Sequence, residues 1–271
     1  AGIIYPIVMG WQWGGGWLAA AGFSDFAGST LVHSTGGSAA LAGALLLGSR
    51  TGRFDAKGVP KALQPFAASS VPLVTLGVFV LWLGWFGFNG GSQLALGTFT
   101  DAVAISTIFI NTNLAACGGV MVAAIVPRLL SGKTDVIMML NGAIGGLVAI
   151  TAEPLAPSPL AAILIGGVGG LIVVLGTKLL FAFKIDDVVG AIPAHLFAGI
   201  WGTLAVPLTN ADASFGAQLI GVLAVNIFVF IVALIIWTIM KNTMGIRLSK
   251  EAEKLGTDVA ETGVIAYAIR D

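Results

Sequence analysis

The residues of this chain best suited to chemistry are its only two histidines, His33 and His195. Each follows an aspartate by eight residues, with a glycine three residues after that aspartate: Asp25 precedes His33, and Asp187 precedes His195. Two neutral imidazoles can share a proton through a hydrogen bond, one ring as donor and the other as acceptor. Such a pair suits proton relay or the binding of a small polar solute. A lone histidine would more simply bridge helices by hydrogen bonding, but the matched spacing favours a shared functional role.

Helix geometry predicts that both histidines reach the same depth. Eight residues at about 1.5 Å per residue place each histidine roughly 12 Å below its aspartate, and a bilayer core is about 30 Å thick. The two Asp–Gly–His elements begin spans that run in opposite directions, the arrangement of an inverted-topology repeat with a site near the midplane. Asp25 and Asp187 have a plainer role as well, since a carboxylate at a helix start accepts free N–H groups and suits the helix dipole.

The composition indicates the environment of these helices. The chain has 271 residues, of which 57% are hydrophobic and 10% charged, and its mean hydropathy is +0.98. Soluble domains carry about 25% charged residues, so we predict a membrane protein. The net charge is zero and gives no indication of nucleic-acid binding. The single cysteine, Cys117, is interpreted as a small buried residue, and no metal or other cofactor is expected because no Cys, Asp or Glu supplies further ligands near the histidines.

We predict an all-α, multi-span bundle. Residues 1–24 are assigned to the end of an earlier span and an external loop, 25–240 to seven transmembrane helices, and 241–271 to a cytoplasmic tail. Because the chain begins in an apolar run without Met, we expect an N-terminal part to be missing. The predicted spans are Asp25–Leu47, Ser69–Gly91, Asp101–Leu130, Asp135–Ala152, Pro159–Phe183, Asp187–Leu208 and Phe215–Met240.

The basic residues support this count. With seven alternating spans, all 13 Lys and Arg fall on one side, and the other side holds Asp25, Asp101, Glu153 and Asp212. Cytoplasmic loops collect Lys and Arg, so we expect a multi-pass protein of the cell (inner) membrane with its C-terminal tail inside. The basic residues are Arg50, Arg53, Lys57, Lys61, Arg128, Lys133, Lys178, Lys184, Lys241, Arg247, Lys250, Lys254 and Arg270.

Five ordered segments give a resemblance to a known family. They are Trp13–Gly16, Asp25 through His33, Gly84–Ser92 (GWFGFNGGS), Gly142–Thr151 (GAIGGLVAIT) and Lys184 through His195. The sequence resembles the ammonium transporter (Amt/Mep/Rh) family, most closely its bacterial Amt branch, over essentially the whole chain. The resemblance implies a fold of eleven spans and a homotrimer with one pore per subunit. This chain would then run from the end of the fourth span through the eleventh and the tail.

The resemblance also implies roles for individual residues. Trp13 and Ser92 look like an outer recruitment site, where cation–π attraction of about 0.5–2 kcal/mol favours ammonium. Phe88 looks like one member of a phenyl gate and Trp85 like a pore-lining aromatic. His33 and His195 look like the twin-His pair of the pore, while Asp25 looks like the acid that supports the outer site and Asp187 is its counterpart in the repeat. Without the resemblance, an interfacial belt of Trp11, Trp13 and Trp17 and simple packing of the other aromatics would be preferred.

The second Asp–Gly–His element departs from the family pattern. Many members have Asp at Gly190, Phe-Gly at Ile192-Pro193 and Gly at Leu196. Pro193 lacks an N–H and is expected to kink the helix two residues before His195. Leu196 adds bulk beside the imidazole, so we expect a narrower or differently shaped inner vestibule.

The leading function is ammonium or ammonia transport through a narrow hydrophobic pore, with methylammonium as an analogue and the lipid bilayer as surroundings. The alternative is an ammonium sensor of the same fold, coupled to a cytoplasmic signalling domain after Asp271. The resemblance adds a possible PII-type regulator at the tail. An intramembrane enzyme is a remote third class: Ser29 and Thr30 lie near His33, but no HExxH, paired-Asp or GxSxG context accompanies them.

Overall fold

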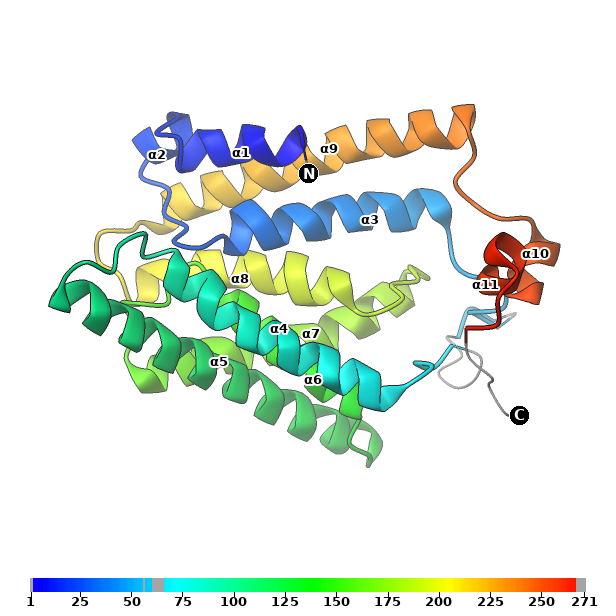
Figure 1. The fold of residues 1–271 in the computed structure, drawn as a ribbon, viewed down its shortest axis with the longest axis horizontal. Coiled ribbons are helices and arrows are strands. Elements are labelled where there is room, and N and C mark those ends of the chain that lie inside the picture. Colours follow the sequence, from blue (N-terminus) through cyan, green and yellow to red (C-terminus); the bar gives the residue numbers. More distant parts are fainter. Residues whose placement is uncertain (1, 56, 60–65, 267–271) are drawn as a thin grey trace.

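The computed structural model describes residues 2–55, 57–59 and 66–266, and the regular elements among them are helices packed roughly side by side (Figure 1). Two of these elements, η1 and η2, are π-helical, and η3 is a 3₁₀ turn. The elements are α1 (Ile4–Gln12), α2 (Trp17–Ala20), η1 (Ser29–Ser34), α3 (Thr35–Leu47), α4 (Val71–Gly91), α5 (Phe99–Ser131), α6 (Val136–Ile150), α7 (Pro159–Ala182), η2 (Ile192–Phe197), α8 (Ala198–Ala205), η3 (Val206–Leu208), α9 (Phe215–Thr243), α10 (Lys250–Leu255) and α11 (Thr257–Thr262).

Helices occupy all seven predicted spans, but two of these helices are shorter than a membrane-spanning helix needs to be. Five are long and apolar enough to cross a membrane, namely the continuous helix Ser29–Leu47 together with α4, α5, α7 and α9. The other two, Val136–Ile150 and Ile192–Leu208, are apolar helices below that length. The first and sixth spans begin four or five residues later than predicted because Asp25 and Asp187 lie in the turns that precede the helices.

Most of the long helices begin at a polar cap. The hydroxyl or carboxyl oxygens of Ser70, Asp135, Ser158 and Ser214 each accept an N–H from the first turn of the following helix. α5 starts with a complete capping box, in which the Thr98 hydroxyl and the Asp101 carboxylate accept each other's backbone N–H groups. Such caps satisfy N–H groups that the helix leaves free, and in an apolar environment no water replaces them.

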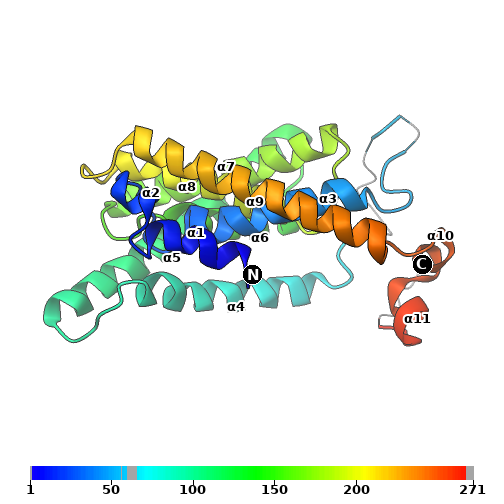
Figure 2. The same cartoon turned by 90° about the horizontal axis from the view of Figure 1, so that it is seen from above.

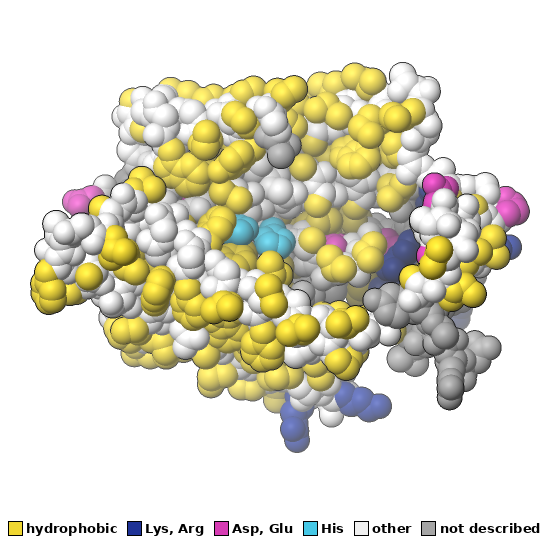
Figure 3. Space-filling model, viewed as in Figure 1, with side chains coloured by type: hydrophobic (Ala, Val, Ile, Leu, Met, Phe, Trp, Pro, Cys, Tyr) yellow, Lys and Arg dark blue, Asp and Glu magenta, His cyan; other side chains and the backbone are white. Residues whose placement is uncertain are grey.

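The two ends of the bundle differ in charge. Both views place the tail helices α10 and α11 at the same end as the loop that follows α3 (Figures 1 and 2). On the face shown in Figure 3, Lys and Arg gather over this half of the molecule. We call this end, with residues 48–55, 57 and 58 of the loop and the turn 183–191, the basic end. The tail itself contains two short helices.

Glycines allow α5, α6 and α7 to approach backbone to backbone. A Cβ added at Gly166 of α7 or at Gly146 of α6 would meet the carbonyl oxygen of Ala115 in α5. The same holds for Gly170, whose Cβ would meet the Gly119 carbonyl. Small residues at helix crossings are typical of membrane bundles, where close packing takes the place of the hydrophobic effect. This packing makes α6 the buried centre of the bundle, because every residue from Gly142 to Ile150 is buried.

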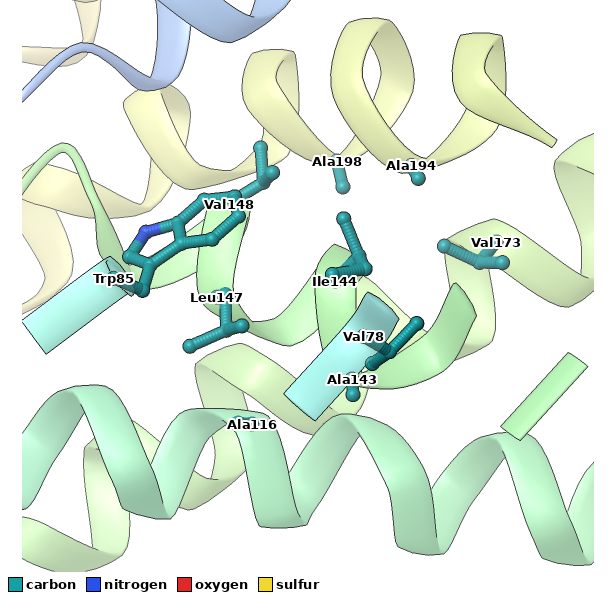
Figure 4. Packing of buried hydrophobic residues seen from close by; sticks show 10 residues of the cluster. All are labelled: Val78, Trp85, Ala116, Ala143, Ile144, Leu147, Val148, Val173, Ala194 and Ala198. Atoms are coloured by element: carbon teal, nitrogen blue, oxygen red, sulfur yellow. The ribbon is translucent and has the colours of Figure 1, made fainter. Parts of the chain in front are cut away.

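A hydrophobic cluster connects this centre to the helices that carry the histidines (Figure 4). Ile144, Leu147 and Val148 of α6 form its middle, and Ala194 and Ala198 flank it from η2 and α8. α4 contributes Val78 and Trp85, and Figure 4 shows the Trp85 ring directed towards Val148. In contrast, most other apolar side chains of α4 are exposed, as expected for a face that meets lipid or another chain.

We expect Gly166→Ala to destabilise the protein by about 1–3 kcal/mol, because its methyl group would meet backbone atoms that cannot rotate away. Gly77→Ala is the matched control, since a Cβ there meets nothing within 4 Å. SDS-induced unfolding in micelles measures both. Equal stability of the two variants would contradict the close α5–α7 contact.

Candidate site at the paired histidines

The carboxylate of Asp25 organises the first histidine-bearing helix. Its Oδ1 accepts the N–H groups of Gly28 (3.0 Å) and Ser29 (2.8 Å), and its Oδ2 accepts those of Thr30 and Leu31 (both 2.9 Å). Asp25 is 1% exposed. It therefore satisfies four successive backbone donors in a buried place. The predicted capping role of Asp25 is confirmed.

Asp187 does the same for the second histidine-bearing helix. Its Oδ1 accepts N–H groups from Val189 (3.4 Å), Gly190 (3.0 Å) and Ala191 (3.0 Å), and its Oδ2 accepts that of Ile192 (2.7 Å). In both elements the glycine three residues after the aspartate has a positive φ, +113° at Gly28 and +75° at Gly190. This conformation suits glycine because it has no Cβ. The repeated Asp–Gly–His spacing therefore reflects a repeated backbone turn.

Each histidine lies in its own single π-helical turn: His33 in η1 and His195 in η2. The kink expected from Pro193 therefore does not distinguish the second element, because η1 has the same π-turn without a proline. Pro193 follows Asp187 by six residues, as Leu31 follows Asp25, so the two occupy the same position in the repeat. The N–H of Leu31 is the fourth donor to Asp25. At the start of a helix the missing N–H costs little. The proline removes one hydrogen bond to the aspartate and leaves the repeat intact.

The structure brings the two histidines into direct contact. The Nδ1 atoms of His33 and His195 are 3.2 Å apart, and the rings lie 5.3 Å between centroids at an interplanar angle of 25°. One Nδ1 must then carry the proton while the other accepts it, an assignment that follows from the geometry of the pair. The Nε2 atom of His33 is buried and has no hydrogen-bond partner among the described residues.

Two glycines set the distance between the histidine-bearing helices. A Cβ at Gly37, four residues after His33, would lie 2.5 Å from the backbone nitrogen of Leu196. A Cβ at Gly199, four residues after His195, would lie 3.3 Å from the Ser34 backbone nitrogen. The contacts are reciprocal, as the inverted repeat requires. Leu196 is 6% exposed and packs in this contact between helices, which is where its bulk beside the histidine is accommodated.

Two aromatic side chains of α4 cover His33. The Trp85 ring stacks on the imidazole at 4.8 Å between centroids and 18° between planes, and the Phe88 ring lies at 5.2 Å and 40°. Trp85 is fixed by a hydrogen bond from its Nε1 to the Thr151 hydroxyl (2.9 Å), which in turn donates to the Leu147 carbonyl (2.7 Å). The aromatic residues singled out in the sequence are thus brought to the histidines.

The proposed outer residues are placed less closely. Trp13 is 39% exposed and its Nε1 donates to the backbone oxygen of Asp25 (2.9 Å), which connects it to the start of the His33 helix. Ser92 is the C-cap residue of α4, and its hydroxyl donates to the Phe88 carbonyl (2.8 Å). Each is therefore linked to one wall of the histidine site. Their action as one recruitment site stays a prediction.

The sequence analysis missed the polar residues that support the site. Thr151 anchors Trp85, and Asn226 of α9 accepts hydrogen bonds from Ser34 and Ser38 (both 2.6 Å). Hydroxyl and amide groups are common in membrane helices, so nothing in their spacing marked them out. Among the described residues, no group of three His, Cys, Asp or Glu lies close enough to hold a metal ion.

The histidines are visible from one side of the molecule. In Figure 3 they lie in a hollow of the surface, bordered by the helices at the top of the view and by the layer of α4 and α5 below. The surface immediately around the histidines is mainly apolar and uncharged. Many membrane transporters have oppositely directed repeats that meet at a polar site, and the arrangement of the two histidine-bearing helices is similar.

Comparison with known sequences identifies the family. The profile of the Ammonium Transporter Family matches residues 1–267, and the chain belongs to this family. It is 43% identical over 267 residues to a putative ammonium transporter of Synechocystis, covering 97% of this chain and 59% of the relative. It is 40% identical over 296 residues to the ammonium transporter Amt2 of Archaeoglobus fulgidus, covering 98% and 62%. The chain thus spans about three fifths of the length of these relatives.

Solved structures support the same fold. A protein described as a sensor Amt protein superposes with a TM-score of 0.89 at 34% identity, over 96% of this chain and 67% of the other. Candida albicans Mep2 gives a TM-score of 0.82 at 32% identity, over 96% and 60%. The predicted fold class is confirmed, and the protein is a multi-pass helical membrane protein.

We expect Asp25→Asn to destabilise the protein by about 2–3 kcal/mol, because an amide offers one acceptor oxygen to four N–H groups and places its own donors among them. The N-cap variant Asp135→Asn should change stability by less than about 0.5 kcal/mol, since Asn caps as well as Asp. SDS-induced unfolding compares the two variants. Similar losses in both would mean that Asp25 is an ordinary cap.

Proposed function

We propose that the protein conducts ammonium nitrogen across the membrane along a path that passes the His33–His195 pair. The observation that carries the proposal is the 3.2 Å Nδ1–Nδ1 contact in an apolar bundle, with the Nε2 of His33 buried and without a hydrogen-bond partner in the described part of the chain. A buried polar atom without a partner is costly. A small solute that donates or accepts one hydrogen bond removes that cost, and ammonia and ammonium both qualify.

The pair suits this solute because its proton can be rearranged. If His195 donates to His33 through Nδ1, then the Nε2 of His33 carries a hydrogen; if His33 donates, its Nε2 is a bare acceptor. In the second arrangement the Nε2 can take a proton from ammonium. Moving an ion through an apolar passage is expensive, so transfer of the proton before crossing lowers the barrier for neutral ammonia.

Aromatic groups on the path favour a cation before that step. Trp13 is partly exposed, and Phe88 and Trp85 lie over His33. Cation–π attraction is strongest for a desolvated cation. We infer that Trp13 and Ser92 recruit ammonium, that Phe88 separates them from the histidines, and that Trp85 forms the wall beside His33.

Substituting Asp for His33, or Ala for His195, should lower methylammonium flux or its coupling to protons by about tenfold or more, because a positioned proton acceptor contributes at least that much. Flux and current in liposomes measure the effect. Ser106→Ala is the control, since that hydroxyl donates only to Ala102 within its own helix. Wild-type currents in both histidine variants would sink the proposed role of the pair.

Trp13→Leu should raise the KM for methylammonium by about 2- to 30-fold, the equivalent of the lost cation–π attraction, and leave Vmax nearly unchanged. Trp17→Leu is the matched control, because Trp17 is also exposed (48%) but packs against Trp11. The concentration dependence of uptake separates the two. An equal rise in KM for both variants would argue for a general effect on the surface.

An ammonium sensor is the second candidate, favoured by the likeness to the sensor Amt protein. The same liposome assay separates the two, because a sensor would be stabilised by methylammonium yet pass little of it. The named relatives are transporters, which points away from an enzyme. In addition, the hydroxyls near His33 are engaged elsewhere: Ser29 donates to the Val148 carbonyl, and Thr30 bonds Thr203.

We further propose that the basic end faces the cytoplasm, following the excess of Lys and Arg in its loops. A homotrimer is inferred from the resemblance to the family, and the exposed apolar faces of α4, α5 and α9 are suitable for lipid and for such neighbours. A PII-type regulator at the tail remains an inference from the same resemblance.

A further inference from the structure

The loop after α3 is attached to the turn before η2 by several contacts at the basic end. The Ser49 hydroxyl donates to the Lys184 carbonyl (2.9 Å), and Gly58 lies so close to Lys184 that a Cβ there would meet its side chain. Lys184 has a positive φ of 57°, which is uncommon outside glycine. The loop belongs to the helix of His33 and the turn to the helix of His195, so these contacts join the two histidine-bearing segments a second time.

Asp186 is the centre of these contacts. It accepts three hydrogen bonds from Arg50, at 3.0 Å from the backbone N–H, 2.8 Å from Nε and 2.9 Å from Nη2. Arg53 adds a fourth from its Nε at 3.3 Å. Burial would raise the pKa of this carboxyl, but the hydrogen bonds and charge of Arg50, with the charge of Arg53, lower it below its usual value. The group is therefore a carboxylate at neutral pH.

Arg53 connects Asp186 to α7. The guanidinium is 7% exposed and lies over the ring of Phe181 at 4.8 Å, with Phe66 at 5.5 Å and Phe54 at 5.8 Å. Removing one partner from a buried ion pair leaves the other charge uncompensated. The position of the loop after α3 therefore depends on the negative charge of Asp186 as well as on the shape of the Asp186 side chain.

Asp186 is followed directly by Asp187, whose carboxylate holds the first N–H groups of η2. η2 contains His195, eight residues after Asp187, in the single turn that reaches His33. Asp186 does not contact either ring. It fixes the backbone from which the Asp187 side chain and the whole of η2 are oriented.

We propose that Asp186, through Arg50 and Arg53, is a positioning residue that holds His195 in register with His33. The inference rests on the proposed function, since it concerns the same histidine pair. It assigns a role in conduction to an ion-pair cluster at the basic end, away from the aromatic groups that receive the cation. Loss of the cluster should slow transfer at the histidines and leave recruitment at Trp13 unaffected.

Asp186→Asn should lower Vmax for methylammonium by about tenfold, because small misplacement of reacting groups costs one to two orders of magnitude, with KM within about twofold of wild type. Asp186→Glu, which keeps the charge, should retain most of the flux. Asp135→Asn is the control for removing a carboxylate at the same end, since Asp135 only caps α6. Unchanged Vmax in Asp186→Asn, or a rise in KM equal to the fall in Vmax, would overturn the proposal.

A second variant covers the case in which Asp186→Asn does not fold. The Arg50 side chain is a third exposed (34%), so Arg50→Gln should be tolerated. The substitution removes the guanidinium that pairs with Asp186. It should lower Vmax in the same way. Where Asp186→Asn does fold, the double variant should be no worse than the more severe single one, because the two residues act as a unit. Additive losses would show that they act separately and would overturn the proposal.

A distance measurement tests the positioning without relying on transport. Spin labels at Leu45→Cys on α3 and Val189→Cys before η2, both at exposed positions, are introduced in a Cys117→Ala background. Wild type should give one narrow distance distribution, and Asp186→Asn a broader or shifted one. Broadening in a protein without flux would reject the proposed transport function but keep the positioning role of Asp186, whereas an unchanged distribution would reject that role itself.

Discussion

The whole site depends on one constraint: in an apolar bundle, the free N–H groups at a helix start must find acceptors within the protein. Asp25 and Asp187 meet this constraint with two carboxylate oxygens for four backbone donors each. A helix whose first N–H groups are accepted in this way can begin inside the bundle, and its first turn can be a π-turn. The turn gives each histidine its direction, so an acid that does not contact either imidazole determines where the imidazoles point.

The two histidine-bearing segments are complementary as well as similar. Gly37 meets Leu196, and Gly199 meets Ser34, so each helix supplies the gap that the other one fills. α6 lies beside both, and its glycines let α5 and α7 close around it. This close backbone packing explains how short, imperfect helices such as Ile192–Leu208 are held in place: they are surrounded by longer ones rather than stabilised by their own length.

The positions of the helices and the meeting of the two histidines could be predicted because these follow from local rules, namely hydropathy and the repeated Asp–Gly–His spacing. The aromatic cover of His33 by Trp85 and Phe88 was expected only through the family resemblance. Thr151, Asn226 and the Asp186 cluster were not predicted, since their partners are distant in the chain: Thr151 reaches Trp85 66 residues away, and Asp186 reaches Arg50 136 residues away. The π-turns were also missed, because no residue type specifies them and Pro193 suggested a kink in one element alone.

The contact of like atoms, Nδ1 with Nδ1, is what a two-fold axis between the repeats would produce. A single hydrogen cannot obey that symmetry, because it belongs to one ring or the other at any moment. The pair therefore has two tautomeric forms that differ in which half of the molecule presents an N–H and which presents a lone pair. The framework around the pair is not symmetric in its side chains, because Trp85 and Phe88 lie against His33, and this difference in surroundings gives the two forms unequal energies.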